Sequence, residues 1–278
     1  MKILIIGAKG LLGSYLVKTF QDHEVLAWDR DEIDITDPIG TRTQLVSVRP
    51  DILINCAAYN DVDRAEQESK IANEANGHAV GYLASVAAEI GCIIVHYSSA
   101  FVFDGNDSRG YAEDASPSPE SAYARSKVLG EEAIAKSGAQ WYLIRTDRLY
   151  GTLPSGHGGK KPFPDLMIEL AGKKPFLEVV DNERGSPTYA LDLAKSTRYM
   201  IESKQPYGIY HRTGSGACTW YEWACEIFKI KNMAVDIRPA SRNKFPVPAP
   251  RPKFAILQNT KLPPLRPWQE ALREYFAI

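Results

Sequence analysis

Strand-like and helix-like segments alternate along residues 1–150, and this alternation constrains the fold more than any other feature of the sequence. Short runs rich in β-branched residues are typical of buried parallel strands, and helical spacing of apolar residues lies between them. The expected strands are KILIIG, HEVLAW, DILINCAAY, CIIVHYSS and WYLIRT. Because such alternation builds right-handed βαβ units, we expect an α/β protein with a doubly wound parallel sheet.

Helices are indicated between these strands. Asp37 is a typical N-cap residue and Pro38 suits the first helical position, which predicts a helix over 38–48. Residues 61–90 are expected to be mostly helical. The stretch SAYARSKVLGEEAIAKSG, which starts at Ser121, has a capping serine and a glycine stop, as a complete helix would.

After Gly151 the alternation breaks up into loops rich in Gly, Pro and Lys. Further helices are expected near 163–172, 189–203, 219–229 and 268–276. The segment GIYHRTG favours one strand that returns to the main sheet. We therefore predict a first domain over residues 1–150, joined by part of 176–211, and a smaller α/β lobe over 151–278. The lobe is expected over the carboxyl ends of the strands, where ligands bind in such folds.

Composition and charge exclude several classes of partner. The net charge is −1 and 24% of the residues are charged, so neither nucleic acid nor an anionic membrane is expected as a main partner. No apolar stretch is long enough to span a bilayer. The four cysteines form no C-x-x-C pair and the five histidines are scattered. We therefore expect no metal site and a reduced, cytoplasmic protein.

A glycine-rich turn follows the first strand. In GAKGLLG, Gly7, Gly10 and Gly13 are three residues apart and open a helical segment. Such a turn brings the N–H groups of a helix start close to a pyrophosphate, and Asp29 stands where an acidic residue binds the adenosine ribose. Residues 1–150 are therefore expected to bind a nicotinamide dinucleotide. The expected cofactor-binding residues are Gly7, Gly10, Leu11, Leu12, Gly13, Asp29, Arg30, Asp34, Ile35, Ala57, Ala58, Tyr59, Tyr123 and Lys127.

The residues leave two points of this site open. Asp29 favours NADH because its carboxylate accepts from ribose hydroxyls, whereas Arg30 favours NADPH because it can pair with a 2′-phosphate. Ala57, Ala58 and Tyr59 are expected beside the phosphate and ribose, but the two alanines are equally consistent with close strand packing.

Tyr123 and Lys127 stand four residues apart in an expected helix, and Ser99 ends the fourth strand. A ketone that accepts a hydride needs a proton, and a phenol with an ordinary pKa of about 10 is a weak donor near neutrality. A neighbouring ammonium is expected to lower that pKa and to hold the nicotinamide ribose. The hydroxyl of Ser99 can fix the carbonyl oxygen. These three are candidate catalytic residues; the alternative is a pair of solvated side chains.

Several segments carry a resemblance to a known family. They are GAKGLLG, DEIDITD, INCAAYNDVDRAE, SSAFVFDG, YARSKVLGEE, RGSPTYALDLA and APRPKFAILQNTKL, in this order along the whole chain. In these motifs the chain resembles the extended short-chain dehydrogenase/reductases and, within them, the dTDP-4-dehydrorhamnose reductase family. The resemblance implies a Rossmann domain with a sugar-nucleotide lobe, NADPH or NADH as hydride donor, and reduction of a 4-keto sugar attached to dTDP. It places Ser99, Tyr123 and Lys127 at the family's catalytic positions.

The chain departs from the family pattern on the substrate side. The family usually reads Ser-Thr-Asp-Tyr-Val-Phe, whereas Ala100 and Phe101 replace the Asp and Tyr here, and Arg148 stands where a tryptophan is usual. Because a phenol hydroxyl is lost and a positive charge is gained, we hypothesise a more acidic or differently substituted sugar, or a smaller ketone. The expected substrate-binding residues are Val62, Ala100, Phe101, Arg148 and Arg251.

Two further segments have open interpretations. Residues 238–267 carry seven Lys or Arg and no acid, so they either offset the charge of a nucleotide diphosphate or form a solvated surface. HGGKK, at 157–161, is either a loop over the cleft or a plain surface loop. Trp220, Trp223 and Trp268 are expected in the core of the lobe.

Two other functions stay open at this point. The regulatory subunit of methionine adenosyltransferase resembles the same family, so a non-catalytic NADP-binding subunit is one alternative. A nucleotide-sugar epimerase with tightly held NAD is the other. A 4,6-dehydratase is disfavoured because Ala100 and Phe101 cannot supply the acidic pair that it needs. The sequence is also compatible with a homodimer.

Overall fold

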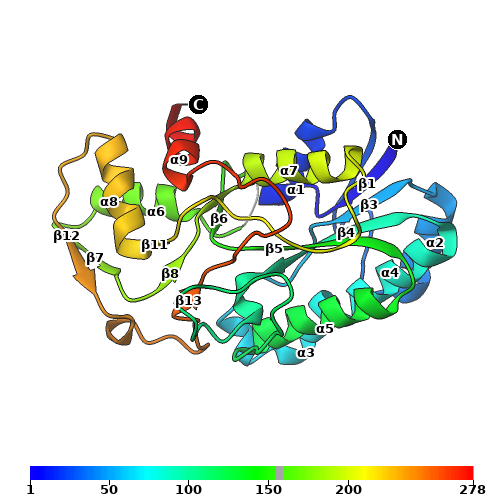
Figure 1. Cartoon of the computed structure of the whole chain (residues 1–278), viewed down its shortest axis with the longest axis horizontal. Coiled ribbons are helices and arrows are strands. Elements are labelled where there is room, and N and C mark those ends of the chain that lie inside the picture. Colours follow the sequence, from blue (N-terminus) through cyan, green and yellow to red (C-terminus); the bar gives the residue numbers. More distant parts are fainter. Residues whose placement is uncertain (155–158, 278) are drawn as a thin grey trace.

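The computed structural model describes residues 1–154 and 159–277, and its centre is a six-stranded, wholly parallel sheet (Figure 1). The order across the sheet is β10-β5-β4-β3-β1-β2. Its strands are β1 (Lys2–Ile6), β2 (Glu24–Trp28), β3 (Ile52–Asn55), β4 (Ile93–Ser99), β5 (Gln140–Thr146) and β10 (Gly208–His211). The strand order reverses between β1 and β3, so their carboxyl ends form the crevice where such folds bind ligands. The expected doubly wound α/β fold is confirmed.

Helices cover both faces of this sheet (Figure 1). One face carries α1 (Leu11–Thr19) and α7 (Ala190–Glu202); the other carries α2 (Pro38–Val48), α4 (Ala79–Ile90) and α5 (Ala122–Lys136). Alternate side chains of β1 enter the two cores: Ile3 and Ile5 pack under α1 and α7, while Leu4 and Ile6 pack on the opposite side. Because both faces are buried, the strand is a continuous apolar run.

A smaller lobe occupies the left part of Figure 1. Its helices are α6 (Phe163–Ala171), α8 (Trp220–Ile230) and α9 (Trp268–Ala277). Its short strands are β6 (Leu149–Tyr150), β7 (Leu177–Val180), β8 (Arg184–Gly185), β9 (Thr188–Tyr189), β11 (Cys218–Thr219), β12 (Ile237–Ala240) and β13 (Phe254–Ala255). Trp223 and Trp268 are buried in the lobe core and Trp220 packs against it, as expected. The segment 208–211 returns to the main sheet, where β10 pairs with β5.

Two expected elements differ from the structure. The third strand ends at Asn55, so Cys56–Tyr59 is a loop rather than its continuation. The helical region 61–90 is interrupted: η1 (Arg64–Glu66) and α3 (Ser69–Asn73) precede a π-helical turn, η2 (Glu74–His78), which runs into α4. The π turn contains Asn76, whose contacts are described below.

Within residues 1–154 and 159–277, no helix has the length and apolar character needed to cross a membrane. In that same part of the chain, no group of three or more His, Cys, Asp and Glu side chains is arranged to hold a metal ion. Of the expected loop at 157–161, residues 157 and 158 lie outside the described residues. Lys160 pairs with Asp61 at 3.1 Å.

Candidate active site

The glycine turn forms a tight cradle at the carboxyl end of β1. Gly7 has a φ of 76°, and a Cβ there would lie 2.8 Å from the backbone nitrogen of Ala57. A Cβ on Gly13 would lie 2.1 Å from the carbonyl oxygen of Gly7, so α1 packs directly on the turn. Within the described part of the chain, no side chain caps the start of α1 at Gly10. Its first N–H groups therefore suit a phosphate, and a dinucleotide pyrophosphate fits this cradle.

Asp29 lies over this cradle from the end of β2. Its Oδ2 accepts the backbone N–H of Lys9 at 3.0 Å, and its Oδ1 accepts the N–H of Arg30 at 2.9 Å. The carboxylate is thereby fixed beside the glycine turn, where it can also accept from a ribose hydroxyl. Asp34 differs, because its Oδ1 accepts both the backbone N–H and the hydroxyl of Thr36. The neighbouring Ile35 is buried in the core.

The loop after β3 is held by Asn76, a residue that belongs to none of the sequence motifs. Asn76 is fully buried; its Oδ1 accepts the Tyr59 N–H at 2.8 Å and its Nδ2 donates to the Tyr59 carbonyl at 3.0 Å. The same Nδ2 donates to Ser126 Oγ at 2.9 Å, and Ser126 in turn donates to the carbonyl of Tyr123. Asn76 therefore joins the expected cofactor loop to α5. Asn76 lies in a π-helical turn, and such turns concentrate at functional sites.

Helix α5 carries Tyr123 and Lys127 and has a well-defined start. Ser121 is its N-cap and accepts the N–H of Ala124, while Glu66 Oε1 accepts the N–H of Ala122 at 2.7 Å. Two of the first free N–H groups of the helix are thus satisfied by side chains, which fixes the turn that carries Tyr123.

Ser99, Tyr123 and Lys127 converge at the carboxyl end of β4. Tyr123 and Lys127 are only 8% and 3% exposed, and Lys127 Nζ donates to the carbonyl of Tyr97 at 2.7 Å. Ser99 accepts the N–H of Phe101 through its Oγ, and the nearby Ser99 hydroxyl lowers the pKa of the Tyr123 phenol. The alternative of two solvated helix residues is wrong, because both side chains are buried.

Burial governs the pKa values of this cluster. It raises the pKa of Tyr123 to about 12, although the Ser99 hydroxyl opposes the change. It lowers the pKa of Lys127 to about 8, although the Glu131 carboxylate opposes that change. The pKa of Tyr123 therefore lies above its ordinary value, and Lys127 is not among the groups that lower it. At this pKa the phenol keeps its proton near neutrality but is a weak acid. It therefore needs the neighbouring ammonium to stabilise the phenolate as the proton leaves.

Two of the expected substrate-binding residues lie beside Tyr123. Val62 and Phe101 pack with Tyr123 in one apolar cluster, and the Phe101 and Tyr123 rings meet edge to face with centroids 6.2 Å apart. Ala100 is fully buried and packs instead with Val102 in a separate core cluster. Its side chain therefore does not reach the cluster around Tyr123.

Arg251, a residue of the lobe, lies beside the apolar cluster around Tyr123. Its Nη2 donates to Asp63 Oδ2 at 2.8 Å and its Nη1 to the carbonyl of Ala249 at 3.0 Å. Its guanidinium lies 6.0 Å from the centroid of the Phe101 ring. A cation from the lobe thus stands at the edge of the apolar cluster.

Arg148 does not supply the free positive charge that the sequence suggested. Its Nη1 donates to the carbonyl of Cys218 at 2.7 Å and its Nη2 to the carbonyl of Glu183 at 3.0 Å. The guanidinium also lies 4.1 Å from the centroid of the Trp220 ring, and the side chain is only 5% exposed. Both Nη atoms of Arg148 donate within the lobe and its guanidinium packs on Trp220. Arg148 therefore has a structural role here.

Most basic residues of the 238–267 segment are paired with acids. The pairs are Arg238–Asp236, Arg242–Glu183, Lys244–Glu178, Arg251–Asp63, and Arg266 with Asp192 and Glu274. The segment is therefore largely neutralised by its neighbours, and Arg251 is the member of these pairs that faces the Tyr123 cluster.

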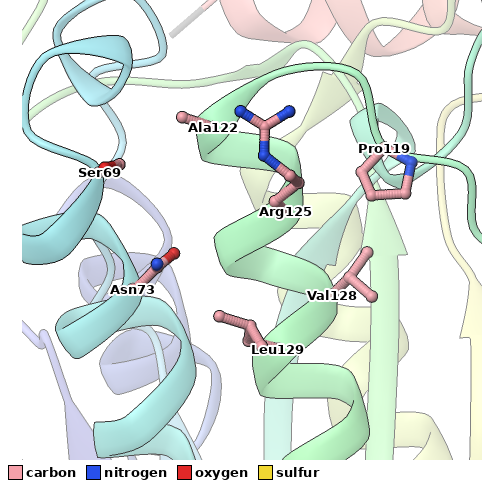
Figure 2. A pocket seen from close by; sticks show the side chains of 7 residues that line it. All are labelled: Ser69, Asn73, Pro119, Ala122, Arg125, Val128 and Leu129. Atoms are coloured by element: carbon pink, nitrogen blue, oxygen red, sulfur yellow. The ribbon is translucent and has the colours of Figure 1, made fainter.

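Two pockets of the described residues are separate from this cluster. The larger, of about 430 Å³, lies between α3 and the outer side of α5. Figure 2 shows Ser69 and Asn73 on one side of it and Ala122, Arg125 and Leu129 on the other. The second, of about 210 Å³, includes Ser186 and residues of the 213–217 loop. Neither pocket contains Tyr123 or Lys127.

Comparisons with known proteins agree with this geometry. The family model described as the RmlD substrate binding domain matches residues 1–278. The spore coat polysaccharide biosynthesis protein SpsK of Bacillus subtilis is 36% identical over 280 residues, which cover 99% of this chain and 96% of that protein. A dTDP-4-dehydrorhamnose reductase of Burkholderia thailandensis is 33% identical, with 100% of this chain and 94% of that protein covered.

A solved structure gives the same result. The crystal structure of dTDP-4-dehydrorhamnose reductase from Bacillus anthracis in complex with NADP superposes with a TM-score of 0.94 and 32% identity. The match covers 99% of this chain and 98% of that chain. The whole length of the chain is thus matched in both sequence and structure, and the chain belongs to the RmlD substrate binding domain family.

Proposed function

We propose that this protein is an NADPH- or NADH-dependent reductase of the ketone of a dTDP-linked deoxy sugar. The observation that carries the proposal is the convergence of Ser99, Tyr123 and Lys127 beside a glycine cradle at the switch point of the sheet. Relatives covering almost the whole chain are named as dTDP-4-dehydrorhamnose reductases, and one was solved with NADP.

The proposed roles follow from chemistry. When bound, the reduced nicotinamide supplies the hydride that forms the new C–H bond at the carbonyl carbon. The hydroxyl of Ser99 hydrogen-bonds the carbonyl oxygen, and Tyr123 transfers its phenolic proton to that oxygen as the C=O π bond breaks. The ammonium of Lys127 stabilises the phenolate that is left and can hold the ribose hydroxyls. The product is a secondary alcohol, and solvent returns a proton to Tyr123.

The proposed cofactor site contains one acidic and one basic side chain, Asp29 and Arg30. The glycine cradle and the start of α1 suit the pyrophosphate, and Asp29 suits a ribose hydroxyl. Arg30 is exposed next to Asp29, where a 2′-phosphate would add an ion pair. We propose on this basis that both NADPH and NADH serve as donors.

The direct experiment is a kinetic assay with purified protein. We expect dTDP-4-dehydrorhamnose to be reduced, but more slowly than a differently substituted dTDP-linked ketone, because Phe101 lacks the usual phenol hydroxyl. The oxidation of NADPH or NADH is measured as the loss of reduced-nicotinamide absorbance, and formation of the alcohol is verified by mass spectrometry. A thermal-shift series with dTDP-, UDP-, GDP- and CDP-linked sugars identifies the nucleotide, because bound ligand raises the melting temperature. Binding of NADPH without turnover of any ketone would instead favour a regulatory subunit. NAD that stays bound in stoichiometric amount through purification would favour an epimerase.

We also propose a cytoplasmic homodimer. All four cysteines are free thiols in the structure, as expected for a reducing compartment. Ile71 and Leu129 are 56% and 38% exposed on α3 and α5, the two helices that flank the larger pocket in Figure 2. Apolar side chains in that position suit a contact between two copies. Light scattering of the protein and of Ile71→Glu tests this: the proposal expects a dimer that the substitution weakens, and a monomeric parent protein would contradict it.

A further inference from the structure

Asp147 occupies a position next to the proposed catalytic group. It directly follows β5, whose last residue, Thr146, pairs in register with Ser99 at the end of β4. The negative charge of Asp147 contributes to the raised pKa of Tyr123. Asp147 is followed by Arg148, so two opposite charges are adjacent in the sequence at this point.

The carboxylate of Asp147 is closely packed by the neighbouring backbone of Gly185 and Ser186. Asp147 is 6% exposed, and its Oδ2 accepts the backbone N–H of Ser186 at 2.9 Å. A Cβ on Gly185 would lie 2.2 Å from Oδ2 and 2.8 Å from Arg148 Nε. Glycine at 185 therefore leaves the space that the carboxylate occupies, and the β8–β9 segment fixes one of its two oxygens.

Its charge is only partly compensated. Arg148 Nε lies 3.8 Å from Oδ2, outside hydrogen-bond distance, because its Nη atoms donate to the carbonyls of Cys218 and Glu183. Burial outweighs the guanidinium and the backbone donors, and it raises the pKa of Asp147 to about 6. A buried carboxylate normally accepts several hydrogen bonds. The donors to Asp147 are backbone N–H groups, that of Ser186 and, through its effect on the pKa, that of Arg148. Among the residues that the structure describes, no side chain donates to it, so the carboxylate retains accepting capacity.

We propose that Asp147 is a specificity-determining residue whose carboxylate accepts a hydrogen bond from a hydroxyl on the sugar carbon next to the ketone. This rests on the proposed function, because it assigns a substrate contact to the same site. A carboxylate only accepts hydrogen bonds, and it repels a phosphate or a sugar acid. The site therefore selects a neutral, hydroxyl-bearing ring, which replaces the more acidic sugar that Arg148 suggested in the sequence.

The test compares two substrates on each enzyme preparation: dTDP-4-dehydrorhamnose and its analogue lacking the hydroxyl beside the ketone. The ratio of the two kcat/KM values is independent of the fraction of active protein, so partial unfolding of a variant does not disturb it. We expect the parent protein to prefer the hydroxylated ketone by about 10- to 100-fold, the range for a hydrogen bond to a charged group. Asp147→Ala should reduce the ratio to about 3-fold or less, mainly by slowing the hydroxylated ketone, and Asp147→Asn should give an intermediate ratio.

The matched control is Asp165→Asn, which alters a lobe carboxylate that accepts from Tyr275 away from the cluster around Tyr123. It should keep the parental ratio. A parental ratio in Asp147→Ala would overturn the assignment. If the parent protein reduced both ketones equally well, the assignment would also fail while the proposed function stood. Failure of the parent protein to reduce either ketone would overturn the proposed function, and the assignment with it.

Discussion

Tyr123 and Lys127 show how little of a site's electrostatics can be inferred from residue types. The four-residue spacing and the helix were predictable, because they follow from the capping serine and the glycine stop. The direction of the Tyr123 pKa was not, because it depends on burial and on the direction in which Lys127 points. Lys127 donates to the carbonyl of Tyr97, and desolvation outweighs any attraction between ammonium and phenolate.

The pH dependence of the reaction should reflect the protonation of Lys127. Because the pKa of Tyr123 is about 12, the phenol keeps its proton over the whole useful range, whereas the ammonium, with a pKa of about 8, loses its charge. We expect kcat/KM for ketone reduction to fall as the pH rises through about 8, approaching tenfold per pH unit. NADPH binding measured by fluorescence over the same range separates this effect from cofactor loss. A rate that stays constant to about pH 10 would contradict the assignment.

The lowered pKa of Lys127 also determines how the free energy of unfolding changes with pH. The pKa of Lys127 is lower in the folded chain than its ordinary value of 10.5, so the unfolded chain binds more protons between about pH 8 and about pH 10.5. The contribution of Lys127 to the free energy of unfolding therefore rises with pH through that window. At lower pH this residue costs stability, as expected of a group retained for chemistry rather than for folding.

At the scale of elements, α5 is positioned by contacts that no periodicity indicates. A π turn at Glu74–His78 places Asn76 against both the loop after β3 and α5. Arg145 of β5 forms a bidentate pair with Glu131 of α5, at 3.0 and 2.6 Å, and both side chains are buried. These contacts join residues far apart in the sequence, so the 61–90 segment was predictable as helical but its interruption was not.

Gly130 provides a test of this packing. A Cβ there would lie 2.2 Å from the carbonyl oxygen of Asn76, so Gly130→Ala must displace α5 from the π turn. We expect a loss of about 1–3 kcal/mol in the free energy of unfolding, together with a lower kcat because Tyr123 and Lys127 move with the helix. Urea unfolding and steady-state kinetics measure the two effects.

Gly81→Ala is the matched control. Its added Cβ would lie 3.2 Å from the Ala133 side chain, a contact that small shifts relieve, and alanine favours a helix over glycine by about 1 kcal/mol. The free energy of unfolding of this variant should equal or exceed that of the parent protein, or fall only slightly below it. Its kcat should be unchanged. Equal stability of the Gly130 and Gly81 variants would contradict the account of how α5 is held.

At the scale of the whole molecule, the lobe meets the sheet domain through charged loops. Asp63, in the loop after β3, accepts from Arg251 and from the N–H of Ala249 in the lobe. Asp61 in the same loop pairs with Lys160. The strand–helix alternation stops near Gly151, which predicts a division of the chain into a sheet domain and a lobe. The pairing of the 238–267 basic residues was not predictable, since their acidic partners lie on other elements.

Arg251 should contribute to binding of the nucleotide part of the substrate. Its guanidinium stands beside Phe101 and is only 16% exposed, so a diphosphate placed there would be bound by a partly desolvated cation. We expect Arg251→Ala to raise the KM for the nucleotide sugar by about 10- to 100-fold while changing kcat little. The control is Arg238→Ala, an exposed arginine of the same segment that pairs with Asp236. An equal KM in both variants would show that Arg251 does not bind the nucleotide part of the substrate.

The central claim is that Tyr123 is the acid that protonates the ketone oxygen, and Tyr123→Phe tests it most directly. Phenylalanine preserves the packing with Phe101 and Val62 and removes only the hydroxyl. We predict a fall in kcat of about 10²- to 10⁴-fold with NADPH affinity nearly unchanged. Tyr142→Phe, which removes a hydroxyl that donates to the Gln205 carbonyl at the opposite end of β5, should stay near the parental rate. A Tyr123→Phe protein that reduced the ketone at the parental rate would contradict the account.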